Sequence, residues 1–523
     1  MLAKVYSASV QGLDAQQVTI EVNSSRGIRF VLVGLPDSAV KESHERIMAA
    51  LENSGFPFPC KQITVNLAPA NVRKVGSGFD LPIAIGILAT AEKVDISRLD
   101  KIMMVGELSL DGSLQPICGA LTIAIKARAL GYESLFVPMQ NIREAAVVDR
   151  IKVYGISHLS ELIGFLNGTH HLDPVQIDTR RDFYDRQAHC DLDFADVKGQ
   201  ESVKRAIEVA AAGGHNLIMI GPPGSGKSMM AKRLPGILPP LTLQESLETT
   251  QIHSVAGKLQ GEQADADGVR HCSLIATRPF RSPHHTISQT ALVGGGSNPQ
   301  PGEISLAHNG VLFADELPEF QRQALEVLRQ PLEDRHISVS RIQGTVDYPC
   351  NFMFVASMNP CPCGYYNHPT KPCVCTPGQI SRYLNKISGP LMDRIDIQCE
   401  ILPLSFEELS KAAPGESSAA IRERVIRARR IQEERFADIP GIHCNAQMTE
   451  KQLKQYCQLS PESFELLRTA MERLQLSARA YSRILKVART IADLDASQDI
   501  QMQHISEAVG YRNLDRSDWA ERG

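Results

Sequence analysis

The sequence predicts an α/β fold in three parts: an N-terminal α/β domain, a central α/β core with a phosphate-binding loop, and a helical C-terminal region. Two observations predict the core. The apolar run Leu217–Ile220 leads directly into a segment that satisfies G-x-x-x-x-G-K-[ST] at every position. That segment consists of Gly221, Pro222, Pro223, Gly224, Ser225, Gly226, Lys227 and Ser228. A second apolar run, Val311–Ala314, ends in two acidic residues, Asp315 and Glu316.

The composition is that of an ordinary soluble globular protein, because 43% of the 523 residues are hydrophobic and 22% are charged. With a formal net charge of −4, any nucleic-acid site would have to be a local patch or a pore. Four of the 12 cysteines crowd between positions 361 and 375, which suits a reducing compartment with one metal site better than a disulfide framework. We find neither a signal-peptide core nor a run of about 18 apolar residues, so we expect a cytoplasmic protein without a membrane span.

Alternating and helical periodicities predict the elements of the N-terminal domain in order. We expect strands at 18–22, 29–33 and 63–67, and helices at 38–53, 81–91 and 114–130.

The N-terminal domain, residues 1–167, resembles the protease domain of Lon (a ribosomal S5 domain 2-like fold) and the similar domain that ends the recombination ATPase RadA. The resemblance rests on the segments 76–84, 106–112 and 116–121. A Lon-type protease needs a serine nucleophile activated by a lysine. The matching positions hold Phe79 and Leu121, while Ser77 and Lys74 lie nearby at positions that do not match. We therefore predict a scaffold or binding platform rather than a peptidase.

Residues 168–190 are polar and without periodicity, and we interpret them as a linker to the central domain, residues 191–405. In the phosphate loop, glycines let backbone N–H groups close around phosphate oxygens. Lys227 would meet the β- and γ-phosphates and the Ser228 hydroxyl would ligate Mg²⁺, at a helix N-terminus that favours anions. The loop predicts that a nucleoside triphosphate binds with Mg²⁺, and the resemblances described below imply that it is ATP.

The order of the later motifs resembles that of AAA+ ATPases. Asp315 would help to hold Mg²⁺ and Glu316 would polarise the attacking water, as in a Walker B motif. Asn359 ends the apolar strand 351–358, where AAA+ proteins carry the sensor 1 residue that orients the water. Helices are expected at 201–212, 242–255 and 321–332, and a hairpin is expected from strands 337–341 and 345–348. The pair His284 and His285 indicates a loop or stacking role, because no third metal ligand follows at helical spacing.

The cysteine-rich segment contains two Cys-x-Cys pairs, formed by Cys361, Cys363, Cys373 and Cys375. Four thiolates suit tetrahedral Zn²⁺, which would stabilise a loop too small for its own core. Free thiols or an iron–sulfur cluster remain alternatives.

Three arginines are candidates for two roles in sensing the γ-phosphate. The run Asp393-Arg394-Ile395-Asp396 resembles the arginine-finger segment of Mg-chelatase and MCM-type AAA+ proteins. Arg394 would then act on a neighbouring subunit and imply an oligomer, whereas the alternative is an ion pair with Asp393 or Asp396. Residues 406–523 are expected to form a helical lid, a Mg-chelatase-like C-terminal domain. In related ATPases the lid donates a sensor 2 arginine, for which Arg479 matches best and Arg483 competes.

Taken together, essentially the whole chain resembles the YifB/ComM family of Mg-chelatase-like AAA+ ATPases. The resemblance implies a bacterial, cytoplasmic ATPase that forms a homo-oligomeric, hexameric ring. In the competence branch of the family, it implies a branch-migration helicase that acts on single-stranded or branched DNA during integration of transforming DNA. The alternatives are a remodelling ATPase that acts on protein partners and a chelatase-type motor, and the N-terminal domain argues against the second.

Overall fold

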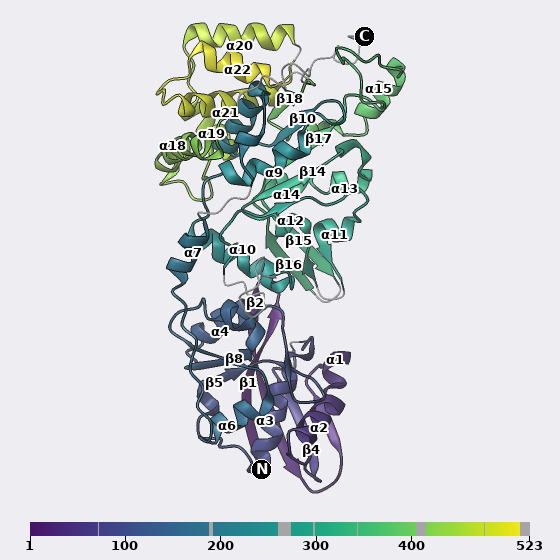
Figure 1. The fold of residues 1–523 in the computed structure, drawn as a ribbon, viewed down its shortest axis with the longest axis vertical. Coiled ribbons are helices and arrows are strands. Elements are labelled where there is room, and N and C mark those ends of the chain that lie inside the picture. Colours follow the sequence, from purple (N-terminus) through teal and green to yellow (C-terminus); the bar gives the residue numbers. More distant parts are fainter. Residues whose placement is uncertain are drawn as a thin grey trace.

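The computed structural model describes residues 1–71, 73–187, 192–259, 274–296, 299–341, 344–403, 415–474 and 476–512. Three parts follow one another along the long axis of the molecule (Figure 1). The N-terminal domain lies at one end, the central α/β core lies in the middle, and the C-terminal helices lie at the other end. Among the described residues, no helix combines the length and the hydrophobicity that a membrane span needs.

The N-terminal domain is built on a seven-stranded sheet in the order β3-β4-β2-β1-β5-β8-β9. These strands are β1 (Leu2–Gln11), β2 (Asp14–Ser25), β3 (Phe30–Val33), β4 (Gln62–Ala68), β5 (Ile102–Met104), β8 (Ser134–Pro138) and β9 (Lys152–Ile156). Successive side chains of a strand point to opposite faces, so the apolar residues of this sheet pack into two separate cores, one on each face. In β5, Ile102 and Met104 join one core, and Met103 joins the other.

Helices cover both faces of this sheet. The fully buried helix α3 (Asp80–Thr90) contributes to one core, and α4 (Ala120–Ala129) contributes to the other. The remaining helices of the domain are α1 (Ser38–Lys41), α2 (Ser43–Asn53), α5 (Ile142–Ala145) and α6 (Leu159–Leu166). The expected strands near 18–22, 29–33 and 63–67 and the helix near 81–91 are confirmed.

Two predicted helices of this domain differ from the structure. The helix expected over 38–53 is interrupted at Glu42, between α1 and α2. The helix expected from 114 begins only at Ala120, because β7 (Leu114–Gln115) pairs with β6 (Glu107–Leu108). Pro116 and Gly119, whose φ of +80° is left-handed, separate that strand from the helix.

The central domain is built on a five-stranded parallel sheet in the order β11-β14-β17-β10-β18. The strands are β10 (Leu217–Ile220), β11 (Phe280–Arg281), β14 (Val311–Ala314), β17 (Met353–Met358) and β18 (Ile397–Glu400). The carboxyl ends of parallel strands meet at one edge of a sheet, where ligands of open α/β folds bind. The phosphate loop, the acidic pair and Asn359 therefore all emerge at the same edge.

The helices of the central domain follow the prediction in part. The helices α8 (Glu201–Gly213) and α10 (Leu243–Val255) and the hairpin β15 (His336–Arg341) and β16 (Gly344–Pro349) lie where they were expected. The single helix expected over 321–332 is instead two short ones, α13 (Arg322–Glu326) and α14 (Arg329–Asp334). Pro331 explains the break, because it has no N–H to donate to the preceding turn. The other elements are α9 (Lys227–Ile237), α11 (Gln289–Val293), β12 (Gly294–Gly295), β13 (Gln300–Pro301), α12 (Glu303–Leu306), α15 (Pro377–Leu384) and α16 (Gly389–Met392).

The C-terminal region is helical, as expected. It consists of α18 (Ser418–Phe436), α19 (Glu450–Tyr456), α20 (Pro461–Arg473), α21 (Ala478–Leu494) and α22 (Met502–Gly510). Buried residues of α18 and α21 share one hydrophobic core with α8 and α9 of the central domain. The expected domain boundary at 405/406 lies outside the described residues.

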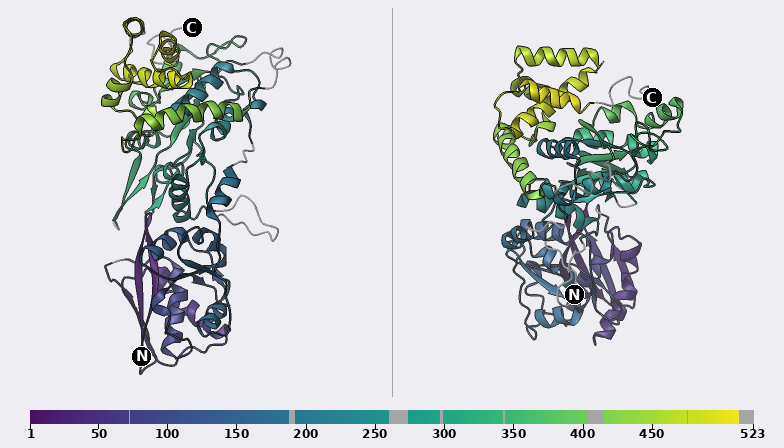
Figure 2. Two further views of the ribbon diagram at one scale, coloured as in Figure 1. Left: turned by 90° about the vertical axis from the view of Figure 1, so that its left-hand side faces the viewer. Right: turned by 45° about the horizontal axis from the view of Figure 1, so that its top comes forward.

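The N-terminal and central domains pack against each other over several elements, among them α4 and α10, where the N–H of Gly119 donates to the carbonyl of Ser254 at 3.1 Å. The turn between β1 and β2 reaches the central domain (Figure 2, left), where Leu13 packs near Val346 of β16 and its carbonyl accepts a hydrogen bond from Gln251. The helix α7 (Thr179–Gln187) occupies part of the segment interpreted as a linker without structure, and its Phe183 is buried in a core that residues of both domains form. The helix was not predicted because the segment is mostly polar; a single aromatic side chain anchors it.

Candidate functional site

The phosphate-binding segment has a backbone that only glycine adopts easily. Gly224 and Gly226 have φ angles of +78° and +89°, in the left-handed region. At Gly221, a Cβ atom would lie 2.6 Å from the carbonyl oxygen of Ile401. The helix α9 starts at Lys227, so the loop leads directly into a helix N-terminus, where backbone N–H groups have no helical partners.

Lys227 is a buried cation at the centre of this loop. Its Nζ atom donates to the carbonyl oxygens of Gly221 and Pro222 at 2.7 and 2.9 Å, and to Oδ1 of Asn359 at 3.3 Å. Burial lowers the pKa of its ammonium group. Neutral acceptors compensate a buried charge only in part, whereas phosphate oxygens would compensate it fully. The loop is therefore suited to a polyanionic ligand.

A chain of hydrogen bonds links the loop to the acidic pair. The Ser228 hydroxyl donates to Oδ2 of Asp315 at 2.7 Å, and the hydroxyl of Ser357 donates to the other carboxylate oxygen. The backbone N–H of Glu316 donates to Ser357 Oγ at 3.3 Å. Ser357 was not among the predicted site residues. Its signal in the sequence is that it is the only hydroxyl in the otherwise apolar strand β17.

These residues fit a Mg²⁺–triphosphate group. Serine and carboxylate oxygens are hard ligands of the kind that Mg²⁺ prefers. The Ser225 hydroxyl is buried without a hydrogen-bond partner, which is unusual and leaves a donor for a ligand oxygen.

Glu316 stands at the end of β14 with a left-handed φ of +54°. Its side chain is 56% exposed and lies 3.7 Å from His285, measured between Oε2 and Nδ1. The His285 ring packs on His284, with 4.1 Å between ring centroids, and meets Phe320 edge-on. The prediction for this pair was a loop or stacking role; the two histidines lie in the loop before α11, with their rings tilted by 33°. The contact between His285 and Glu316 was not predicted, because no local spacing connects them.

The arginine candidates all make ion pairs, Arg394 from the segment before β18 and the other two from α21. The predicted alternative for Arg394, an ion pair with Asp393 or Asp396, is wrong: its guanidinium binds Glu333 at 2.6 Å. The two aspartates instead bind the competing lid arginines. Asp393 pairs with Arg479 at 2.7 Å, and Asp396 pairs with Arg483 at 2.9 Å.

The exposure of the two lid arginines differs. The side chain of Arg479 is 71% exposed, whereas that of Arg483 is 24% exposed and pairs with a buried carboxylate. Both arginines are therefore held by the segment before β18, and Arg479 is the one held by the exposed ion pair.

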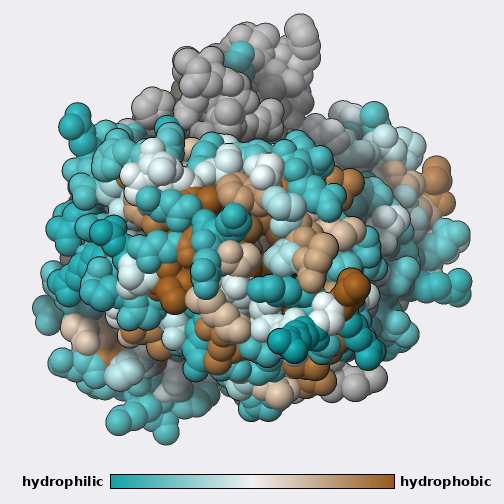
Figure 3. Space-filling model, turned by 90° about the horizontal axis from the view of Figure 1, so that it is seen from below, coloured by the Kyte–Doolittle hydropathy of each residue, from teal (hydrophilic) through white to brown (hydrophobic). Residues whose placement is uncertain are grey.

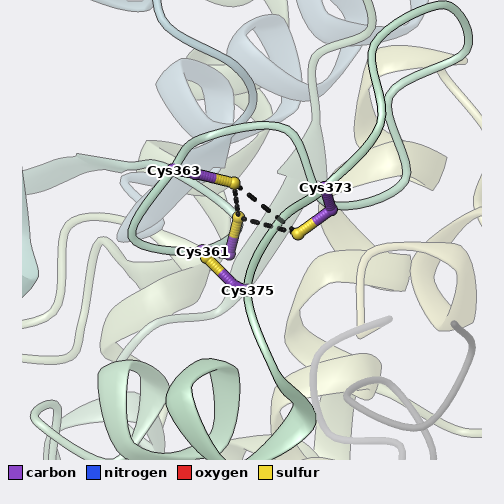
Figure 4. Close-up of side chains that lie close together, drawn as sticks. All are labelled: Cys361, Cys363, Cys373 and Cys375. Carbon is purple, nitrogen blue, oxygen red and sulfur yellow. Dashed lines mark hydrogen bonds between the residues drawn. The ribbon is translucent and has the colours of Figure 1, made fainter.

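The four cysteines of the sequence motif converge in space (Figure 4). Their sulfur atoms all lie within 4.8 Å of one another, and the distances from Cys373 to Cys361 and Cys363 are 3.7 and 3.6 Å. Tetrahedral zinc with Zn–S bonds of about 2.3 Å places sulfur atoms about 3.8 Å apart. Within the cluster the thiols differ: against the effect of burial, backbone hydrogen bonds lower the pKa of Cys363, whereas burial and the neighbouring thiols raise the pKa of Cys373 and Cys375. The donor set therefore fits a structural zinc ion.

The N-terminal domain places no serine–lysine pair at the Lon-like positions, since Phe79 and Leu121 are buried in its two cores. The hydroxyl of Ser77 donates to Glu107, and the buried ammonium group of Lys74 donates to the carbonyl of Pro69. The surface at this end of the molecule intersperses apolar with hydrophilic side chains (Figure 3).

Most of the chain matches known protein families. Residues 193–409 match the family described as magnesium chelatase, subunit ChlI. Residues 20–141 match the family described as subunit ChlI of Mg-chelatase, and residues 415–512 match the C-terminal family of the same subunit.

Individual relatives extend over the full length. The chain is 44% identical over 520 residues to the uncharacterized protein YifB of Salmonella typhimurium, covering 98% of each chain. It is 44% identical over 517 residues to the competence protein ComM of Haemophilus influenzae, again covering 98% of each. It is also 32% identical over 153 residues to Lon protease 2 of Bacillus subtilis, covering 28% of this chain and 26% of that protein.

Proposed function

Because this chain belongs to the Mg-chelatase-like YifB/ComM family of AAA+ proteins, we propose that it is an ATP hydrolase that couples hydrolysis to translocation on DNA. The observation that carries the ATPase part is the hydrogen bond between Ser228 and Asp315 beside the buried Lys227. It brings the two expected Mg²⁺ ligands together at the edge of the sheet where the phosphate loop opens. ATP and Mg²⁺ are therefore the proposed cofactors.

The remaining residues of the site take distinct roles in this proposal. Glu316 polarises the attacking water, and Asn359 orients it while its amide oxygen contacts Lys227. Arg394 stabilises the charge that develops on a neighbour's γ-phosphate, and Arg479 assists from the lid. Glu333, the present partner of Arg394, has a side chain that is 56% exposed, whereas that of Arg394 is 15% exposed. To meet a neighbour's phosphate, Arg394 would have to leave this partly buried pair and turn outward.

An arginine that acts on a neighbour requires an oligomer, and we propose a homo-oligomeric ring, a hexamer as the family resemblance implies. Each nucleotide site would then be completed by the next subunit. An interface that joins different surfaces of identical subunits forms a closed ring when the rotation from one subunit to the next divides a full turn evenly.

The proposed substrate is single-stranded or branched DNA, moved by branch migration during homologous recombination or integration of transforming DNA. A relative is named a competence protein, and competence is the uptake of DNA by cells. The candidate for gripping the DNA strand within the ring is the hairpin of β15 and β16, whose first strand begins at His336 and ends at Arg341. Such binding would be directed mainly to the phosphate backbone and would weaken steeply with salt.

The other parts have supporting roles in this proposal. The four cysteines hold a structural Zn²⁺, and the N-terminal domain is a platform without peptidase activity. The cysteine content fits the cytoplasm as the working compartment. The second candidate function is a remodelling ATPase for protein partners, which the platform domain favours. A chelatase-type motor would share the same core.

The proposal is tested by ATP hydrolysis in the presence of single-stranded, forked and four-way DNA. We expect each branched substrate to raise the rate for the wild type and none to do so for Lys227→Ala. Stimulation by a protein partner, with no response to any DNA structure, would overturn the DNA part and leave the remodelling candidate.

A further inference from the structure

We propose that the four-cysteine centre and the nucleotide site are thermodynamically coupled, so that the bound metal and bound ATP each strengthen the binding of the other. This inference rests on the ATP binding proposed above. It assigns to the metal loop a role beyond its own stability: holding Pro223 and Asn359, two residues of the nucleotide site, in place.

The first link is a backbone contact. Gly364 follows Cys363 directly and has a φ of +83°, and its N–H donates to the carbonyl of Cys361 at 2.9 Å. A Cβ atom at Gly364 would lie 2.6 Å from Cδ of Pro223. The turn between the first two metal ligands and the third therefore packs directly on the phosphate loop, at a distance that only glycine allows.

The second link is covalent. Asn359 stands two residues before Cys361, and its side-chain oxygen accepts the hydrogen bond from Lys227 at 3.3 Å. The metal loop thus begins at a residue that touches the catalytic lysine. It ends at α15, whose Ile380 packs with Cys361 and Tyr366.

The hydrophobic core of the loop is small. Its core, among the described residues, has only Cys361, Tyr366 and Ile380 as buried members. In a segment this small, metal binding supplies much of the folding free energy. Loss of the metal would loosen the segment, and both Pro223 and Asn359 would lose the support that keeps the phosphate loop ready for ATP.

The first experiment uses linkage between the two sites. ATP affinity is measured for the full-length protein with zinc bound and after zinc removal, using a non-hydrolysable ATP analogue with Mg²⁺. Zinc affinity is measured by competition with a zinc-selective chelator, with and without the analogue. We expect about a tenfold change in each, and because coupling is reciprocal the two factors must be equal.

Each outcome has a distinct meaning. Zinc-loaded protein that does not bind the analogue would refute the proposed ATP site itself. Protein that binds it equally well with and without zinc would overturn the coupling alone. Purified protein whose four thiols form disulfides and hold no metal would also overturn it.

The second experiment tests the contact between the loop and Pro223. We expect Gly364→Ala to retain zinc while its affinity for the analogue falls about tenfold, whereas Cys373→Ser loses both. Gly378→Ala is the local control, because a Cβ there meets no atom within 4 Å. Gly441→Ala controls for left-handed strain, since Gly441 has a φ of +79° and equally open surroundings in the lid. Equal nucleotide affinities of the Gly364→Ala and Gly441→Ala proteins would overturn the proposal.

Discussion

The Ser228 hydroxyl lies 2.7 Å from the carboxylate of Asp315, although 87 residues separate them in the chain. The parallel sheet causes this approach, because β10 and β14 lie on either side of β17 and all three end at one edge. The pair is the meeting point of the two sequence motifs from which an ATPase is inferred.

If this pair holds Mg²⁺, removing either oxygen will raise the metal requirement of ATP hydrolysis. For Ser228→Ala and Asp315→Asn we expect the Mg²⁺ concentration at half-maximal rate to rise by roughly 10- to 100-fold. Ser225→Ala separates the nucleotide from the metal in the same loop. Its buried hydroxyl is free to donate to a phosphate oxygen, so we expect this variant to raise the KM of ATP while the Mg²⁺ dependence at saturating ATP stays unchanged. An unchanged Mg²⁺ dependence in both variants would remove this pair from the metal site.

Glu316 is assigned to chemistry rather than to binding. We expect Glu316→Gln to lower kcat by roughly 10²- to 10⁴-fold, the range for a general base, while the Kd of ATP stays within a few-fold. Glu319→Gln serves as the control, because that nearby carboxylate pairs with Lys386 at 3.3 Å. Substantial turnover by Glu316→Gln would assign water activation to another group.

His285 is expected to orient the carboxylate of Glu316, since its ring is fixed by His284 and Phe320. For His285→Ala we expect kcat to fall about tenfold with KM unchanged, because misplacing a catalytic group costs rate rather than affinity.

Three further variants test this role of His285. Asparagine places an amide nitrogen near the position of Nδ1, so His285→Asn should regain most of the rate, and His285→Gln should not. His284→Ala, whose Nδ1 instead faces Thr286 at 2.9 Å, should change kcat less than His285→Ala does. A rise in kcat on loss of His285 would contradict an orienting role.

Local signals explain why so much of the core was predictable. Strands β10, β14 and β17 are apolar runs bounded by turn residues, and the chemistry of phosphate binding restricts the residues at their ends. The four cysteines were found in the same way, because metal ligation restricts their spacing.

The missed features depend on contacts between distant residues. Arg394 binds Glu333, and His285 approaches Glu316, through folding that no local pattern encodes. The prediction of one helix over 321–332 was wrong for a local reason. It relied on the apolar spacing of the segment, although Pro331 cannot donate a helical hydrogen bond. In α7, a single buried aromatic residue, Phe183, anchors a helix that composition alone marks as a linker.

The trans action of Arg394 can be tested by mixing two inactive variants. Arg394→Ala and Lys227→Ala subunits should each hydrolyse ATP at least roughly 10³-fold more slowly than the wild type. In mixed rings, an Arg394→Ala subunit receives its missing arginine from a Lys227→Ala neighbour. We expect equal mixing to restore about one quarter of the wild-type rate, the fraction of interfaces that pair an intact lysine with an intact arginine. No recovery in rings shown to be mixed would place Arg394 in its own subunit's site.

The most direct test of the central claim is ATP-dependent strand displacement on a four-way DNA junction. We predict that the wild type separates the junction only with hydrolysable ATP and Mg²⁺, and that Lys227→Ala and Glu316→Gln do not. ATP hydrolysis without movement of any DNA substrate would contradict the account.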